Sequence, residues 1–270
     1  MELANIKYLE MHVTHACNLA CESCSHYSNH SHRGLLDLEE AAASVANWSK
    51  RVSVKRFRLL GGEPTIHPML PEFVKLARRH LADATVEIVT NGFFLHRHPG
   101  LPYLLDDLGN CEITVSVHHN SPEYMQKIRP VLDLIATWRK KHKFGIIIRH
   151  SYKNWTRRYN GFGSNMLPYE DGEPQASWSI CPARSCIQLF EGALWKCGPI
   201  AYLKLQNERY NLSDRWKRYL EYRPLYLDAS DDELRDFIGR GAESICGMCS
   251  AKKRYFDLPN PLRNGVVAEL

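Results

Sequence analysis

The chain has 270 residues, a formal net charge of +5 and 44% apolar residues, enough to bury the core of one large domain or of one domain with a small companion. No run of 18 apolar residues occurs, so we expect no membrane span. Lysine and arginine are spread along the chain rather than clustered, so we interpret them as a solvated surface, with an anionic or nucleic-acid partner as the alternative.

Strand-like and helix-like segments alternate through residue 149. The expected strands are 6–13, 54–62, 85–90, 112–117 and 144–149. The expected helices are 37–50, 69–81, 101–108 and 122–141. This alternation predicts βα units around a parallel sheet, either a barrel or an open doubly wound sheet. In both folds the chemistry lies at the carboxyl ends of the strands.

The expected strands separate apolar from polar side chains. Leu9 and Met11 share one face of the first strand, and Glu10 and His12 share the other. Helices should cover the apolar faces, so the polar faces would line a water-accessible lumen suited to a polar substrate. The alternative is that some of these strands are edges that face solvent.

Three cysteines follow the first strand directly. Cys17, Cys21 and Cys24 are separated by three and then two residues. The odd total of nine cysteines and the lack of a preceding apolar signal segment argue against disulfides. Zinc binding, completed by nearby histidines, stays open, as does an iron–sulfur cluster with one iron lacking a protein ligand. An open coordination position is typical of a catalytic metal site.

Gly61-Gly62-Glu63-Pro64 follows the second strand. Together with the three-cysteine motif, it resembles the radical S-adenosylmethionine (SAM) superfamily. The resemblance implies an α/β fold with a partial (β/α)6 barrel and a 4Fe–4S cluster held by Cys17, Cys21 and Cys24. It also implies that the free iron chelates SAM, and that Glu63 and the backbone of Gly61 and Gly62 receive the methionine ammonium.

Other residues are placed by the resemblance near the same cofactor. Asn91, Ser116 and Arg149 end the third, fourth and fifth strands and are expected to contact SAM. The alternatives are a turn at Asn91-Gly92 and a surface ion pair at Arg149. Ser23 stands where many members have an aromatic residue near adenine, and Tyr27 is the candidate substitute.

The C-terminal third carries a second cysteine pattern. Cys181 and Cys197 flank Gly192, and Cys246-Gly-Met-Cys249 follows. This resembles the twitch, or shortened SPASM, extension of radical SAM enzymes, a β-hairpin and helix that bind an auxiliary 4Fe–4S cluster through four cysteines. The predicted domains are therefore a partial barrel over 1–177, a twitch domain over 178–252 and a tail over 253–270. A zinc ribbon is the alternative.

Two cysteines are left by these assignments. Cys111 precedes an apolar strand and is expected to be a buried small residue. Cys186 has three candidate roles: it replaces Cys181 as a ligand, it is inert, or it is a catalytic hydrogen-atom donor to a substrate radical. The third role would make the enzyme an epimerase.

The resemblance implies a reaction class. Reductive cleavage of SAM would give a 5′-deoxyadenosyl radical that abstracts hydrogen from substrate. We expect a small polar substrate such as a sugar, an aminoglycoside or a related natural product, which is dehydrogenated or epimerised. The first motif begins at residue 17, so no N-terminal peptide-recognition domain is expected. The alternatives are a peptide- or protein-modifying maturase and a non-catalytic zinc-binding interaction module.

The cellular setting follows from the same features. Cysteines kept as thiolates suit a cytoplasmic protein. The expected partners are the small substrate and a reductant such as flavodoxin or ferredoxin, with no membrane.

Overall fold

The computed structural model describes residues 3–262. The five predicted strands are present as β1 (Ala4–Thr14), β2 (Val52–Gly61), β3 (Thr85–Thr90), β4 (Cys111–Val117) and β5 (Gly145–His150). The four predicted helices between them are α1 (Leu38–Trp48), α2 (Leu70–His80), α3 (Leu101–Leu108) and α4 (Pro122–Lys141). The predicted α/β alternation is therefore confirmed, with boundaries that shift by two residues at most.

Local chemistry explains where these helices begin. The Asp37 carboxylate accepts hydrogen bonds from the backbone N–H groups of Glu39 and Glu40 at the start of α1. The Ser121 hydroxyl accepts one from Tyr124 at the start of α4, where Pro122 occupies the first turn and needs no N–H partner. These caps fix the point at which each loop from the carboxyl edge of the sheet ends.

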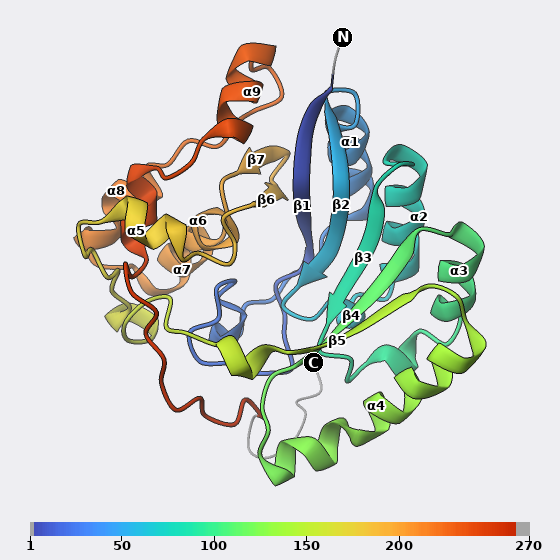
Figure 1. Ribbon diagram of the computed structural model, residues 1–270. Helices are drawn as coiled ribbons and strands as arrows, with labels where there is room; N and C mark the ends of the chain where they lie inside the picture. Colours follow the sequence, from blue (N-terminus) through green and yellow to red (C-terminus); the bar gives the residue numbers. More distant parts are fainter. Residues whose placement is uncertain (1–2, 263–270) are drawn as a thin grey trace.

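The strands form one seven-stranded sheet in the order β5-β4-β3-β2-β1-β6-β7. Strand β6 (Cys186–Phe190) pairs in parallel with β1, and β7 (Ala193–Trp195) returns antiparallel to β6. Helices α1–α4 lie on one side of the sheet, and the C-terminal elements gather beyond the β1 edge (Figure 1).

The sixth parallel strand is not where a (β/α)6 barrel would place it. After β5 the chain forms the short 3-10 helix η4 (Ser151–Asn154) and no further βα unit follows at that edge within residues 3–262. The sixth strand instead comes from the C-terminal third and extends the sheet on the opposite edge, beside β1. The described residues thus form an open sheet of five consecutive parallel strands plus a hairpin.

The two faces of the sheet differ as predicted. Leu9, Met11 and Val13 of β1 belong to the main apolar core, together with residues of α1 to α4. On the other face, Arg58 of β2 forms ion pairs with Glu10 of β1, at 3.0 Å, and with Glu87 of β3, at 2.7 Å. The polar side chains of neighbouring strands therefore satisfy one another across this face rather than leaving it empty.

The C-terminal third builds a second, smaller core. Its helices are α5 (Pro174–Ser179), α6 (Gly198–Ala201), α7 (Leu203–Tyr210), α8 (Lys217–Leu220) and α9 (Asp231–Gly239). Buried Tyr202, Trp216, Tyr219 and Met248 form this core with Tyr27, which comes from the three-cysteine loop. Because β6 and β7 belong to the main sheet, the hairpin joins the two cores, and the boundary between 177 and 178 stays a prediction.

None of the described helices combines the length and the apolar composition that a membrane crossing requires.

Candidate active site

The three-cysteine loop begins where β1 ends, at Thr14. Burial raises the pKa of Cys21 well above its ordinary value, and the neighbouring thiols of Cys17 and Cys24 raise it further. Burial likewise raises the pKa of Cys24. Buried thiols that stand close together ionise only when a cation offsets their charge, so this donor set fits a bound metal cluster.

Two glycines hold this loop against the end of β2. A Cβ atom on Gly61 would lie 2.2 Å from the carbonyl oxygen of Thr14, and one on Gly62 would lie 2.1 Å from that of Ala16. The backbone N–H of Gly62 donates to Thr14, and the N–H of Glu63 donates to Ala16, both at 2.8 Å. Only glycine permits this approach, so the pair positions the cysteines.

Glu63 joins β2 to β3. Its carboxylate is 1% exposed and accepts hydrogen bonds from the Thr65 and Thr90 hydroxyls and from the backbone N–H groups of Thr65, at 3.0 Å, and Asn91, at 2.7 Å. Burial raises its pKa, and these hydrogen bonds partly oppose that rise. In this structure the carboxylate is occupied by its neighbours, and its contact with a methionine ammonium stays a prediction.

A cavity of about 190 Å³ opens above the three cysteines, and we call it the three-cysteine cavity. Its lining includes the following predicted site residues: Cys17, Cys21, Cys24, Gly61, Gly62, Asn91, Ser116 and Arg149. Glu63 does not line it. The structure thus brings together residues from the ends of β1 to β5, as expected for parallel strands that share a carboxyl edge.

The polar side chains that line this cavity differ in how firmly they are held. The Asn91 amide is fixed, because it donates to Asn18 Oδ1 at 2.8 Å and accepts from the backbone N–H of Phe93 at 3.1 Å. The Arg149 side chain is 48% exposed, and its nearest carboxylate, on Glu87, lies 3.9 Å away. Arg149 is therefore the more available group for an incoming carboxylate.

The aromatic wall of the cavity was missed in the sequence. Tyr27 is buried, and its hydroxyl donates to the Pro199 carbonyl oxygen, so it belongs to the second core and not to the cavity lining. Trp155 lines the cavity instead, held by an indole N–H that donates to the Glu22 carbonyl oxygen at 2.7 Å. Trp155 lies outside every motif, so no local signal pointed to it.

His118 also lines the three-cysteine cavity. Burial and the nearby Arg149 guanidinium lower its pKa to about 4. The ring is therefore neutral at neutral pH.

The second cysteine set converges from three segments. Cys181 precedes β6, Cys197 is the N-cap of α6, and Cys246 and Cys249 lie in and just after the 3-10 helix η7 (Ser244–Met248). Burial raises the pKa of Cys197 well above its ordinary value, followed by the thiols of Cys181, Cys249 and Cys246. The other three thiols therefore lie close enough to Cys197 for their charges to interact with it.

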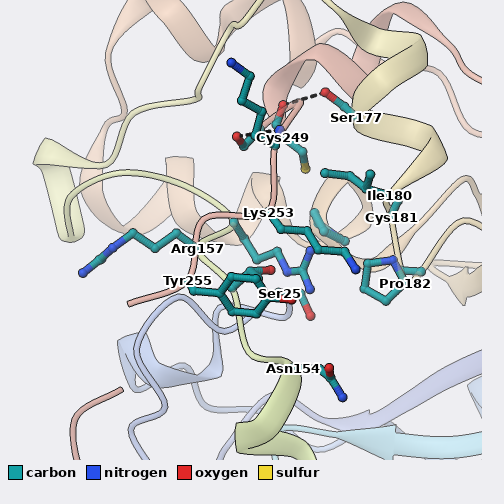
Figure 2. Close-up of a pocket in the computed structure, with 16 residues that line it drawn as sticks. Ser25, Asn154, Arg157, Ser177, Ile180, Cys181, Pro182, Cys249, Lys253 and Tyr255 are labelled. Carbon is teal, nitrogen blue, oxygen red and sulfur yellow. Dashed lines mark hydrogen bonds between the residues drawn. The ribbon is translucent and has the colours of Figure 1, made fainter. Parts of the chain in front are cut away.

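A cavity of about 350 Å³ lies beside this second set, and we call it the Cys181–Cys249 cavity. Figure 2 shows Cys181, Cys249 and Lys253 around it. The Ser177 hydroxyl of α5 donates to the Cys249 carbonyl oxygen at 2.9 Å, which fixes the C-terminal segment against α5.

Cys186 stands apart from the four converging cysteines. It is the first residue of β6, and its sulfur accepts from Arg58 Nη1 at 3.7 Å on the polar face of the sheet. Burial raises its pKa, and the nearby Glu10 carboxylate raises it further, so the thiol stays protonated. It lines a broad cleft of about 590 Å³ that also contains Cys181, which we call the Cys186 cavity. Cys111 is buried, as predicted.

Comparison with known proteins identifies the family. The model of the radical SAM superfamily matches residues 11–149, about half of the chain. The chain belongs to the radical SAM superfamily. It is therefore a radical SAM enzyme, for which the family implies a 4Fe–4S cluster and SAM.

Curated relatives match over shorter stretches. A GTP 3′,8-cyclase from Chlorobaculum tepidum is 36% identical over 92 residues, which cover 34% of this chain and 28% of the relative. A second, from Aquifex aeolicus, is 33% identical over 127 residues, or 46% of this chain and 38% of the relative. The chain thus spans well under half of these radical SAM relatives, and their names do not support a sugar or aminoglycoside substrate.

A solved structure matches over a larger share of this chain. The complex of BtrN with AdoMet and 2-DOIA aligns with a TM-score of 0.50 and 18% identity over 89% of both chains. At this identity the likeness shows the fold alone, and it extends beyond residues 11–149 into the C-terminal third.

Proposed function

We propose that this enzyme abstracts hydrogen from a small polar substrate held between its two cysteine sites. The observation that carries the proposal is that three cavities share lining residues. Arg149 lines both the three-cysteine and the Cys186 cavity, and Ser25 lines both the three-cysteine and the Cys181–Cys249 cavity. A substrate in the shared space would lie between the three-cysteine loop and Cys181.

The residues of the first site have distinct roles in this proposal. Cys17, Cys21 and Cys24 would hold the 4Fe–4S cluster, and Asn91, Ser116 and Arg149 would contact SAM. When bound, the cluster supplies the electron that cleaves SAM to methionine and a 5′-deoxyadenosyl radical, which abstracts hydrogen from substrate. Trp155 would cover the cavity and exclude water from the reacting atoms.

We assign the second set to a twitch-like auxiliary cluster. Supporting this, Cys181 and Cys197 flank the β6–β7 hairpin, and Cys197 caps the helix that follows it. A zinc ribbon, and with it a non-catalytic interaction module, is the alternative, and iron and zinc analysis of the purified protein separates the two.

The substrate class rests on the shape of the shared space. The Cys186 cavity is lined mainly by polar and charged side chains, and the joined space fits a small molecule such as a sugar derivative or related natural product, to be dehydrogenated or epimerised. A peptide- or protein-modifying maturase is the alternative, since the broad Cys186 cavity of about 590 Å³ would admit an extended side chain.

The direct test is SAM cleavage by anaerobically reconstituted protein with dithionite. We expect 5′-deoxyadenosine and methionine in equal amounts by liquid chromatography. Cys111→Ala is the matched control, because Cys111 is buried outside both cysteine sites, and it should retain the activity. Protein with a full iron complement that forms no 5′-deoxyadenosine would overturn the proposal.

A second candidate outcome, epimerisation, is favoured by the environment of Cys186. The protonated Cys186 thiol lines the Cys186 cavity and can give its hydrogen atom to a substrate radical, forming the new C–H bond and a thiyl radical. One electron from the reductant and one solvent proton would restore the thiol. In a dehydrogenase the substrate radical would instead lose one electron and one proton, the four cysteines of the second set would hold the group that accepts the electron, and Cys186 would transfer no hydrogen.

Isotope labelling separates these two outcomes. An epimerase in D2O should place one deuterium on the inverted carbon, since the thiol exchanges with solvent. A dehydrogenase should give a product two hydrogens lighter. Cys186→Ala should stop inversion while 5′-deoxyadenosine still forms, and unchanged inversion would exclude Cys186 as the donor.

A further inference from the structure

The cavities beside the second cysteine set are lined by cations. The Cys181–Cys249 and Cys186 cavities share Ile180, Cys181, Pro182 and Lys253, and we call the joined space the basic cleft. Arg157, Arg158 and Lys252 line it on one side, and Arg149 and Arg184 on the other. Among the residues described, no aspartate or glutamate lines either part.

Some of these cations already have partners. Arg157 pairs with Glu22 at the edge of the cleft, and the Arg184 guanidinium donates to the Ser179 carbonyl oxygen at 2.9 Å. Arg158 lies near enough to Cys249 to lower the pKa of that thiol, so it offsets the charge of the second cysteine set. These partners thus offset only part of the positive charge that lines the basic cleft.

Lys252 and Lys253 remain without an ion pair within residues 3–262. Both are exposed, and Lys253 stands at the junction of the two cavities, facing the shared space between the cysteine sites. Adjacent unpaired cations repel each other and raise the local concentration of anions. This focus of charge lies where the proposed substrate would bind.

We propose that the basic cleft binds a phosphate or diphosphate group of the substrate, with Lys252 and Lys253 as its main contacts. This inference rests on the proposed function and narrows its substrate to a phosphorylated small molecule. A phosphate ester carries about −1.5 to −2 charges and forms charge-assisted hydrogen bonds with lysine. An aminoglycoside carries several ammonium groups and would meet like charge here, so the cleft selects against it.

The test uses inorganic pyrophosphate as the probe. Isothermal titration of the reconstituted, SAM-loaded full chain should show binding that weakens with added salt, and spermine should not bind. Lys252→Met with Lys253→Met should weaken pyrophosphate binding by about tenfold or more, because two charged contacts are lost. Lys140→Met with Lys141→Met removes the same charge from the exposed end of α4 and should leave binding unchanged.

The iron content of both double variants and their 5′-deoxyadenosine yield without substrate should match the parent, which shows that each has folded. Equal binding by the two double variants would overturn the inference, as would tighter binding of spermine than of pyrophosphate. Pyrophosphate that fails to bind to protein able to cleave SAM defeats the phosphate site alone. Fully iron-loaded protein that binds pyrophosphate but cleaves no SAM defeats the proposed function alone.

Discussion

The two cysteine sites are built in opposite ways. Cys17, Cys21 and Cys24 lie in one loop between β1 and α1, whereas Cys181, Cys197, Cys246 and Cys249 come together from three separate segments. Three protein ligands leave one iron of a four-iron cluster open, and four close it. With the cluster proposed for the second set, the local site is suited to binding a cofactor and the assembled site to holding three segments of the C-terminal third together.

What holds each site in place differs as well. The three-cysteine loop is fixed by backbone contacts with Gly61 and Gly62, which end the rigid strand β2. The second set sits on the small aromatic core around Trp216 and Tyr219. Metal binding should therefore contribute more to folding in the second region than in the first.

The largest expected effect is at the local site. Cys17→Ala, Cys21→Ala and Cys24→Ala should each abolish 5′-deoxyadenosine formation, since a cluster with two protein ligands is not retained in a form that binds SAM. Full activity in any one of these variants would break the distinction between an open and a closed site. Chromatographic detection with dithionite as reductant measures it.

The next effect concerns the assembled site. Replacing Cys181, Cys197, Cys246 and Cys249 together by alanine should lower iron from about eight to about four per chain. The protein should stay soluble but melt at a lower temperature, because the cluster no longer joins three segments of the second region. Iron that stays near eight would contradict the ligand choice, and Cys186 would be the first residue to reconsider.

A smaller effect is expected at Glu63, which lies beneath the three-cysteine loop and contacts it through the backbone. Glu63→Ala removes the acceptor for hydrogen bonds from Thr65, Thr90 and Asn91 and leaves buried donors unpaired. We expect a loss of about 2–3 kcal/mol in the free energy of unfolding and weaker SAM binding. Glu39→Gln, on exposed α1, is the control. SAM affinity lost at full stability would show instead that Glu63 contacts the cofactor directly.

An effect of similar size is expected from pH at His30, which follows the three-cysteine loop and contacts Tyr159 of the second core. Burial holds the pKa of His30 at about 4, against an ordinary 6.5, so between these values the unfolded chain binds a proton that the folded chain does not. Stability should therefore fall as pH drops from about 6.5 to 4, by up to about 3 kcal/mol from this residue.

His30→Phe tests that dependence, since it keeps the stack on Phe162, whose ring centroid lies 4.1 Å away. Denaturant unfolding of the variant should show a shallower loss of stability with acid than the parent. Identical slopes would mean that His30 does not resist protonation.

The strands and helices through residue 150 were predictable because each is specified by local periodicity and by caps such as Asp37 and Ser121. The pairing of β6 with β1 was not, since these segments lie far apart in the chain and no local pattern specifies their register. The same holds for Trp155, which reaches the cavity from a turn with no motif.

The site residues divide along the same line. The three-cysteine loop was readable from spacing, because its ligands are neighbours in sequence. The second set was expected only from a family resemblance, and its convergence depends on tertiary packing. Nothing local marked Lys252 and Lys253, since two lysines in an exposed segment resemble any solvated surface until the fold places them in a cleft.

The contrast between an open and a closed site is tested most directly by electron paramagnetic resonance of the reduced protein, recorded with and without SAM. We predict two 4Fe–4S signals, of which SAM shifts one. Cys17→Ala should remove the SAM-sensitive signal and leave the other. A protein that contains zinc in place of one cluster, or in which SAM shifts both signals or neither, would contradict the account.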